Sequence, residues 1–283
     1  MLENINKIAV CGAGTMGLGI AQVFAQNNFS VLLFDTQQSV LEKAIATITK
    51  NIDGAVAKGK MTLEEKTKTL ANIATTVDVQ TVKADLIIEA IIENIVIKKE
   101  LFATLASNNN ATTILASNTS SLAISLIAKG IPNPERVLGI HFFNPAHLMK
   151  LVEVINGVTT TENVTNTVVA LIKKIGKTPV VCKDSPGFIV NRVARHYYVE
   201  SLKLAEERVA SLSQIDRLIE SMGFKMGPFT LMDTIGNDIN FAVTKSLFDA
   251  FHGEPRFRPS RLQQQKVDAG HLGKKTGHGF FDY

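Results

Sequence analysis

The pattern of hydrophobic and polar positions along the chain changes near residue 185. Before that point, short apolar runs alternate with longer stretches of helical periodicity, which is typical of strand–helix–strand units around a parallel sheet. After that point, only helical periodicity is found. The first part predicts strands at 7–11, 31–35, 85–90, 112–116, 136–142, 151–157 and 178–184, and helices at 17–27, 38–58, 62–71, 97–107, 121–129 and 162–175. The second part predicts helices at Phe188–Val209, Ser213–Met222 and Leu231–Phe251, with Ser213 as an N-cap.

A length of 283 residues accommodates two domains of ordinary size. The turn-forming sequence Asp184-Ser185-Pro186-Gly187 separates the two patterns. We therefore predict an α/β domain with a mostly parallel sheet over residues 1–185, followed by an all-helical C-terminal domain over residues 186–283.

A glycine-rich turn follows the first predicted strand. Gly12, Gly14 and Gly17 match the pattern G-x-G-x-x-G immediately before a helix-like stretch. In a dinucleotide-binding turn, the first glycine permits the tight turn, the second leaves room for the pyrophosphate, and the third lets the helix pack on the strand. The phosphates bind at the N-terminus of the helix, where Thr15 and Met16 lie. The motif predicts a Rossmann-type domain that binds a dinucleotide.

An acidic residue follows where such a domain binds ribose. Asp35 ends the second predicted strand, about 20 residues after the glycines, and a carboxylate there accepts from a 2′-hydroxyl. It would repel a 2′-phosphate, and no arginine occurs among the next residues, Thr36, Gln37 and Gln38. The sequence therefore favours NAD over NADP. The alternative interpretation is a glycine turn followed by an aspartate that only caps the next helix.

Composition and charge exclude several classes of protein. The chain is 45% hydrophobic and 20% charged, as globular proteins are, and its most apolar stretch, Leu86–Ile97, is interrupted by Glu89 and Glu93. We expect no membrane segment. The net charge of +4 comes from scattered lysines and arginines, so nucleic acid is not an expected partner.

The N-terminal sequence and the cysteines indicate a cytoplasmic protein. The N-terminal residues lack the basic and apolar regions of a signal peptide, and they run straight into the first strand. Cys11 and Cys182 lie in apolar runs, which is typical of buried thiols in a reducing compartment, and their spacing predicts no metal site. The proline-separated cluster Arg256, Arg258 and Arg261 is interpreted as an exposed loop.

A histidine and a carboxylate occur in neighbouring extended runs. His141 lies near the end of strand 136–142, and the polar sequence at 117–121, which includes Asn118 and Ser120, ends another strand. Ligands of open α/β sheets bind beyond the carboxyl ends of the strands. Hydride transfer from an alcohol requires a base for the hydroxyl proton, and His141 is the expected base. Glu153 would accept a hydrogen bond from the other ring nitrogen of His141, as the carboxylate does in a Ser-His-Asp triad.

Several motifs in a fixed order resemble the L-3-hydroxyacyl-CoA dehydrogenase family, most closely its short bacterial 3-hydroxybutyryl-CoA dehydrogenases. They are SNTSSL at 117–122, HFFNP at 141–145, MKLVEV at 149–154, KDSPGFIVNR at 183–192, MGPF at 226–229 and GKKTGHGF at 273–280. The resemblance runs along the whole chain. It implies oxidation of L-3-hydroxyacyl-CoA by NAD, with an acyl-CoA substrate and a homodimer formed by the helical domain.

The resemblance also implies roles for individual residues. His141 matches the catalytic histidine and Glu153 its paired acid, while Ser120 and Asn191 match residues that bind the substrate oxygen. Asn144 matches a residue near the nicotinamide. The positions that match contacts to NAD are Asp35, Glu93, Lys98 and Lys275. Lys58, which ends the helix at 38–58 and by itself fits a solvated helix end equally well, matches a lysine that meets the coenzyme A moiety.

One segment departs from the family pattern. After Asn191-Arg192 the family usually continues with apolar residues and a proline, whereas this chain reads Val193-Ala194-Arg195-His196-Tyr197-Tyr198. We expect this change to affect the acyl pocket or the dimer contact. Two other functions stay open: a sugar-acid dehydrogenase similar to L-gulonate 3-dehydrogenase, and a non-catalytic dinucleotide-binding protein.

Overall fold

The computed structural model describes residues 5–283. The chain divides into two compact units, one ending at Ser185 and one spanning Pro186–Tyr283. None of the described helices combines the length and the apolarity needed to cross a membrane.

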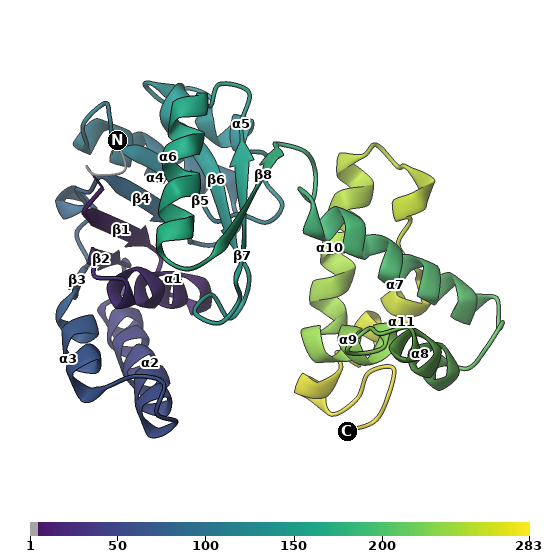
Figure 1. Cartoon of the computed structure of the whole chain (residues 1–283). Helices are drawn as coiled ribbons and strands as arrows, with labels where there is room; N and C mark the ends of the chain where they lie inside the picture. The colour runs from purple at the N-terminus through teal and green to yellow at the C-terminus, as the bar shows by residue number, and fades with distance from the viewer. Residues whose placement is uncertain (1–4) are drawn as a thin grey trace. The chain divides into compact units, whose positions relative to one another are not determined.

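The first unit is built on an eight-stranded sheet (Figure 1). Its strands are β1 (Lys7–Cys11), β2 (Ser30–Phe34), β3 (Ile73–Thr76), β4 (Leu86–Glu89), β5 (Ile114–Ser117), β6 (Val137–Phe142), β7 (Leu151–Asn156) and β8 (Thr178–Lys183). They lie in the order β3-β2-β1-β4-β5-β6-β7-β8, and every neighbouring pair is parallel except β6 and β7. The predicted mostly parallel, Rossmann-type sheet is confirmed. Because the chain leaves β1 for β2 on one side and returns to β4 on the other, the strand order switches at β1, where a ligand crevice is expected.

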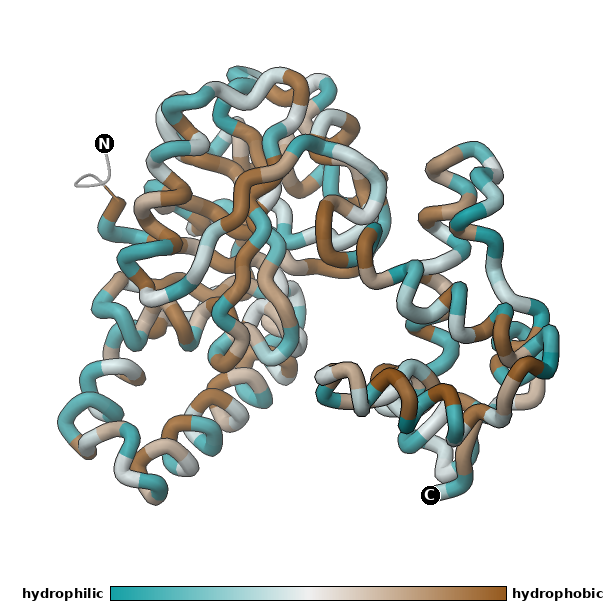
Figure 2. Tube along the Cα trace, turned by 45° about the vertical axis from the view of Figure 1, so that its right-hand side comes forward, coloured by the Kyte–Doolittle hydropathy of each residue, from teal (hydrophilic) through white to brown (hydrophobic). Residues whose placement is uncertain are grey.

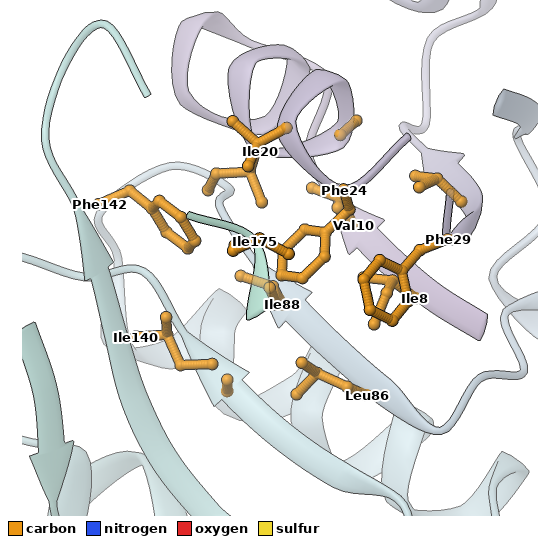
Figure 3. Close-up of a cluster of buried hydrophobic side chains, with 14 of the residues drawn as sticks. Ile8, Val10, Ile20, Phe24, Phe29, Leu86, Ile88, Ile140, Phe142 and Ile175 are labelled. Carbon is orange, nitrogen blue, oxygen red and sulfur yellow. The ribbon is translucent and has the colours of Figure 1, made fainter. Parts of the chain in front are cut away.

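Helices cover both faces of this sheet. They are α1 (Thr15–Gln26), α2 (Gln38–Ala57), α3 (Leu63–Ala71), α4 (Ile95–Asn108), α5 (Ile124–Ala128) and α6 (Glu162–Lys174). On one face, α1 and α6 pack over alternate strand residues such as Ile8, Ile88 and Ile140. Figure 3 shows α1 above these residues. Phe24 of α1 makes edge-on contact there with Phe142, their ring centroids 6.4 Å apart. The intervening strand residues are also buried, which is why these strands appear as continuous apolar runs.

The segment between β2 and β4 contains a strand that the hydrophobic pattern did not predict. Its helices α2 and α3 agree with the prediction, and a capping box between Thr62 and Glu65 starts α3. The missed element is the edge strand β3, whose residues Ile73–Thr76 are all exposed or half-buried. An edge strand with little burial carries no apolar run. Along this segment, hydrophilic and hydrophobic stretches alternate (Figure 2).

The second unit is all helical, as predicted. Its helices are α7 (Val190–Glu206), α8 (Leu212–Ser221), α9 (Pro228–Ile235), α10 (Asn237–Ala250) and α11 (Arg261–Asp268). The predicted helix over 231–251 is wrong at its start, because Gly236, at φ 105°, separates α9 from α10. The N-cap of α8 is Ser211 rather than Ser213, since the Ser211 hydroxyl accepts from the backbone N–H of Gln214. Arg261 begins α11 instead of lying in a loop.

The segment that departs from the family pattern buries two of its side chains, Arg195 and Tyr198, in the interior of this second unit. Arg195 is 4% exposed and donates to the carbonyl of Asn240 and the hydroxyl of Thr244. Its guanidinium also lies over the ring of Tyr198. Burial lowers the pKa of Arg195 to about 10, so the group stays charged at neutral pH. Arg195 therefore stabilises the packing of α7 on α10.

A buried aspartate fixes the C-terminal segment of the same unit. The Asp233 carboxylate accepts from the backbone N–H groups of Phe280 and Phe281 and from the Tyr283 hydroxyl. A side chain at Gly279 would meet this carboxylate, since a Cβ there would lie 2.1 Å from its Oδ1. The glycine in the C-terminal motif is thus required by the aspartate around which the segment folds.

Candidate active site

The glycine turn has the geometry of a dinucleotide-binding loop. Gly12 has φ 99°, and a Cβ there would lie 2.6 Å from the Ala90 carbonyl oxygen. A Cβ at Gly17 would lie 1.7 Å from the Gly12 oxygen, so only glycine lets α1 start this close to the loop. At Gly14, by contrast, a Cβ would have no heavy atom within 4 Å, and Gly14 has no side chain to cap α1. Open space before an uncapped helix N-terminus suits a phosphate.

The end of β2 is joined to this loop by Asp35. Its Oδ2 accepts from the backbone N–H of Ala13 at 2.9 Å, and its Oδ1 accepts from that of Gln37 at 3.1 Å. A cavity of about 600 Å³ lies beside it, lined by residues that include Gly12, Gly14, Asp35, Ala90 and Ile91. Apolar side chains and Asp35 suit an adenosine. The lining residues contain acids but no lysine or arginine, which favours NAD over its phosphorylated form.

A buried charged cluster lies beyond β4. Lys98 is 1% exposed, and its ammonium lies 2.5 Å from Glu89 Oε1 and 3.1 Å from Glu93 Oε2. Glu93 also accepts hydrogen bonds from the hydroxyls of Thr119 and Ser121. Burial alone would raise the pKa of Glu93, but these hydroxyls and the Lys98 charge outweigh it, so its pKa lies below the usual value. The ion pair with Lys98 therefore positions Glu93, and the hydrogen bonds to Glu93 position the loop after β5.

That loop contains two of the predicted site residues. The Asn118 side chain is buried, and its Oδ1 accepts from the backbone N–H of Phe142 at 2.8 Å. Asn118 thus joins the ends of β5 and β6. Ser120 is half-buried between Thr119 and Ser121, both of which bind Glu93. The hydroxyl of Ser120 is therefore carried by a loop that is fixed on both sides.

His141 and Glu153 are brought together by the antiparallel pairing of β6 and β7. The two residues are direct partners in the ladder, so their side chains leave the sheet on the same face. His141 Nδ1 lies 2.7 Å from Glu153 Oε2, and the Glu153 side chain is 1% exposed. Because a carboxylate only accepts, the neutral form of the imidazole that fits this contact carries its proton on Nδ1 and a lone pair on Nε2. The ring of Phe143 lies against the imidazole, at a centroid distance of 4.6 Å. This is the geometry of an oriented general base.

The remaining predicted residues lie at the surface or in the second unit. Asn144 is exposed immediately after β6 and precedes Pro145 in a cis peptide bond. Lys58 is exposed at the C-terminal end of α2. Asn191 is half-buried in the first turn of α7, and the Lys275 ammonium lies 2.7 Å from the Asp238 carboxylate. The roles of these residues stay predictions. Among the described residues, no group of three histidines, cysteines or acids could hold a metal ion.

Glu89 was not among the site residues predicted from the sequence. It was considered only as a charge that interrupts an apolar run, yet its side chain is fully buried and joins three segments of the site. The available signal was its position, because an acid that directly ends a buried strand of a parallel sheet faces the ligand crevice.

Two family models match almost the entire chain. The 3-hydroxyacyl-CoA dehydrogenase NAD binding domain matches residues 7–185, and the C-terminal domain of the same family matches residues 187–283. The chain belongs to the 3-hydroxyacyl-CoA dehydrogenase family. This family identifies the first unit as an NAD-binding domain and the chain as an NAD-dependent oxidoreductase, which confirms the family, the enzyme class and the cofactor predicted from the sequence.

Individual relatives are similar over the whole chain. A 3-hydroxyadipyl-CoA dehydrogenase of Escherichia coli (strain K12) is 47% identical over 100% of this chain, which spans 60% of that protein's length. A 3-hydroxybutyryl-CoA dehydrogenase of Clostridioides difficile is 40% identical over 98% of this chain and 99% of its own. The crystal structure of (S)-3-hydroxybutyryl-CoA dehydrogenase from Ralstonia eutropha has a TM-score of 0.96 at 36% identity, with 99% of both chains covered.

Proposed function

We propose that this protein interconverts short-chain L-3-hydroxyacyl-CoA, such as 3-hydroxybutyryl-CoA, and the corresponding 3-ketoacyl-CoA. The observation that carries the proposal is the buried His141–Glu153 pair, 2.7 Å apart, at the end of the NAD-binding sheet. The relatives support the substrate class, because those that match this chain over nearly their full length include 3-hydroxybutyryl-CoA dehydrogenases.

The side chains have distinct tasks in this reaction. Bound NAD supplies the hydride acceptor. In the oxidative direction, His141 Nε2 takes the proton of the 3-hydroxyl, and the imidazolium that results is stabilised by Glu153. In the reductive direction the same nitrogen returns the proton. Ser120 and Asn191 donate hydrogen bonds to the substrate oxygen, and Lys58 binds the anionic coenzyme A moiety.

The cofactor is held by the glycine turn and the segments around it. The backbone N–H groups at the start of α1 bind the pyrophosphate, and Asp35 accepts from the adenosine ribose. Asn118, Asn144, Glu93, Lys98 and Lys275 support the nicotinamide half. Lys98 acts through Glu93, because its own ammonium is buried.

We further propose a cytoplasmic homodimer formed through the helical unit. Large apolar side chains of this unit are exposed, among them Val193 at 66%, Leu218 at 63%, Met222 at 67% and Phe224 at 51%. Such side chains are typical of protein interfaces. Two unpaired cysteines agree with a reducing compartment. Sedimentation equilibrium tests the dimer, and a monomer at micromolar concentration contradicts it.

An absorbance assay tests the catalytic proposal. The protein is expected to oxidise NADH, and NADPH far more slowly, in the presence of acetoacetyl-CoA. His141→Gln is expected to lower kcat by roughly 10²–10⁴, the usual contribution of a general acid or base, while NADH affinity is unchanged. Near-normal turnover of this variant contradicts the assignment of the base. Activity with a free 3-hydroxy sugar acid alone supports the sugar-acid alternative, and NADH binding without any turnover supports the non-catalytic one.

A further inference from the structure

Glu89 is held by hydrogen-bond donors alone. Its Oε1 accepts from the Lys98 ammonium at 2.5 Å and from the backbone N–H of Ile91 at 2.8 Å. Its Oε2 accepts from the Ser117 hydroxyl at 2.7 Å, and that hydroxyl in turn accepts from the backbone N–H of Thr119. A protonated carboxyl would need an acceptor for its own proton, so this surrounding fits the ionised form.

Glu89 therefore connects three parts of the site. Ile91 lines the cavity beside Asp35, and Lys98 forms an ion pair with Glu93. Ser117 is the last residue of β5, directly before the loop that carries Ser120. All three partners depend on a side chain that is fully buried at the last position of β4.

The cluster has an excess of negative charge. Within the described part of the chain, Lys98 is the only cationic side chain paired with Glu89 or Glu93. Two carboxylates and one ammonium leave one net negative charge. Glu89 and Lys98 are almost completely buried and pair at 2.5 Å, so the excess charge lies mainly on Glu93, whose side chain is 39% exposed and is screened by solvent in part.

The reaction places the nicotinamide close to this charge. Hydride leaves the carbon whose oxygen is bound by His141 and Ser120, so the acceptor ring must lie beside that carbon. Ser120 stands between two residues that bind Glu93. The ring is cationic in NAD⁺ and neutral in NADH, so a nearby negative charge stabilises the oxidised form selectively.

We propose that Glu89 is a positioning residue, and that its cluster with Lys98 and Glu93 biases the site toward the oxidised cofactor. Glu89 fixes Lys98, Ile91 and Ser117, and through them Glu93 and the Ser120 loop. The net negative charge lowers the dissociation constant of NAD⁺ relative to that of NADH. This inference rests on the proposed function.

Binding of both cofactor forms to Glu89→Gln tests the inference. Dissociation constants of NAD⁺ and NADH are measured by titration calorimetry on the full chain, and kcat is measured with acetoacetyl-CoA. The Kd ratio of NAD⁺ to NADH is expected to rise about three- to tenfold, the effect of one charge at about 10 Å through a partly hydrated site. A role in packing alone would weaken both cofactor forms equally. An unchanged ratio in folded Glu89→Gln overturns the proposal.

Two further variants separate charge from geometry. Ser117→Ala removes a hydrogen bond to Glu89 without changing charge, so it should lower kcat and leave the ratio unchanged. If the Kd ratio of NAD⁺ to NADH shifts as much in Ser117→Ala as in Glu89→Gln, the electrostatic explanation is contradicted. Glu93→Gln, whose side chain is 39% exposed, should raise the ratio in the same direction as Glu89→Gln. If Glu89→Gln does not fold, an unchanged ratio in Glu93→Gln overturns the proposal.

The matched control is Glu135→Gln, which removes an exposed carboxylate immediately before β6, at the opposite end of the sheet. Its Kd ratio should equal that of the wild type. If the wild type itself does not turn over acetoacetyl-CoA, the proposed function fails. If the wild type is active and the Glu89→Gln ratio is normal, only the present inference fails.

Discussion

Replacing Glu153 with glutamine removes the charge that orients and stabilises the catalytic imidazole while nearly preserving the side-chain shape. The Glu153 side chain is 1% exposed, and its Oε2 lies 2.7 Å from His141 Nδ1. A glutamine oxygen can still accept from Nδ1, so the tautomer with a basic Nε2 is retained. The variant therefore isolates the charge.

The expected loss follows from the change in that hydrogen bond. A charge-assisted hydrogen bond contributes about 1.5–3 kcal/mol, against about 1 kcal/mol for a neutral one. In the transition state the imidazole gains positive charge, and two unit charges at about 4 Å attract by about 4 kcal/mol at an effective dielectric constant of 20. The amide dipole of glutamine replaces part of this attraction. A loss of about 3 kcal/mol corresponds to a fall in kcat of about 10²-fold.

The assay compares kcat and NADH affinity in Glu153→Gln with those of the wild type. NADH affinity should be unchanged, because Glu153 contacts the base rather than the glycine turn. Glu162→Gln, which removes a carboxylate in the first turn of α6, is the matched control and should behave as the wild type does. A value of kcat within twofold of the wild type in Glu153→Gln would refute the role of the dyad.

Three further predictions concern other parts of the chain. Gly17→Ala should abolish measurable NADH binding and lower the thermal midpoint, because its Cβ would lie 1.7 Å from the Gly12 oxygen; calorimetry with and without NADH checks this. Asp233→Asn should release the C-terminal segment, seen as faster amide exchange over residues 280–283, and slow exchange there would contradict it. Cys11 is buried as expected, whereas Cys182 is only half-buried; both should resist alkylation at pH 8 in the native protein, because desolvation and nearby carboxylates raise the pKa of Cys182 to about 12 and that of Cys11 further, and rapid modification would contradict these raised pKa values.

The hydrophobic pattern predicted most of the first unit because its central strands are buried on both faces. The runs that form β1, β4 and β6 contain little else than apolar residues, so they differ sharply from the helices between them. β3 escaped prediction because its pairing with β2, rather than its own burial, makes it a strand. Pairing between distant segments leaves no local signal.

Within the site, the residues with catalytic chemistry were easier to predict than the hydrogen bonds and ion pairs that position them. His141 and Glu153 stood out because a base and an acid occurred in neighbouring extended runs. The environment of Lys98 could not be predicted in this way, because its burial between Glu89 and Glu93 depends on how α4 packs against β4. In the helical unit, the break at Gly236 was missed because apolar spacing continues across it, and only the backbone angle shows that two helices meet there.

The antiparallel pairing of β6 and β7 makes the spacing of the catalytic pair a property of strand register. A shift of β7 by one residue would put Val152 or Val154 opposite His141 and turn Glu153 to the other face of the sheet. The residues at 143–150 that join the two strands are free of this restriction. Changes at the exposed positions of this segment could therefore reshape the mouth of the site while the base and its acid remain paired.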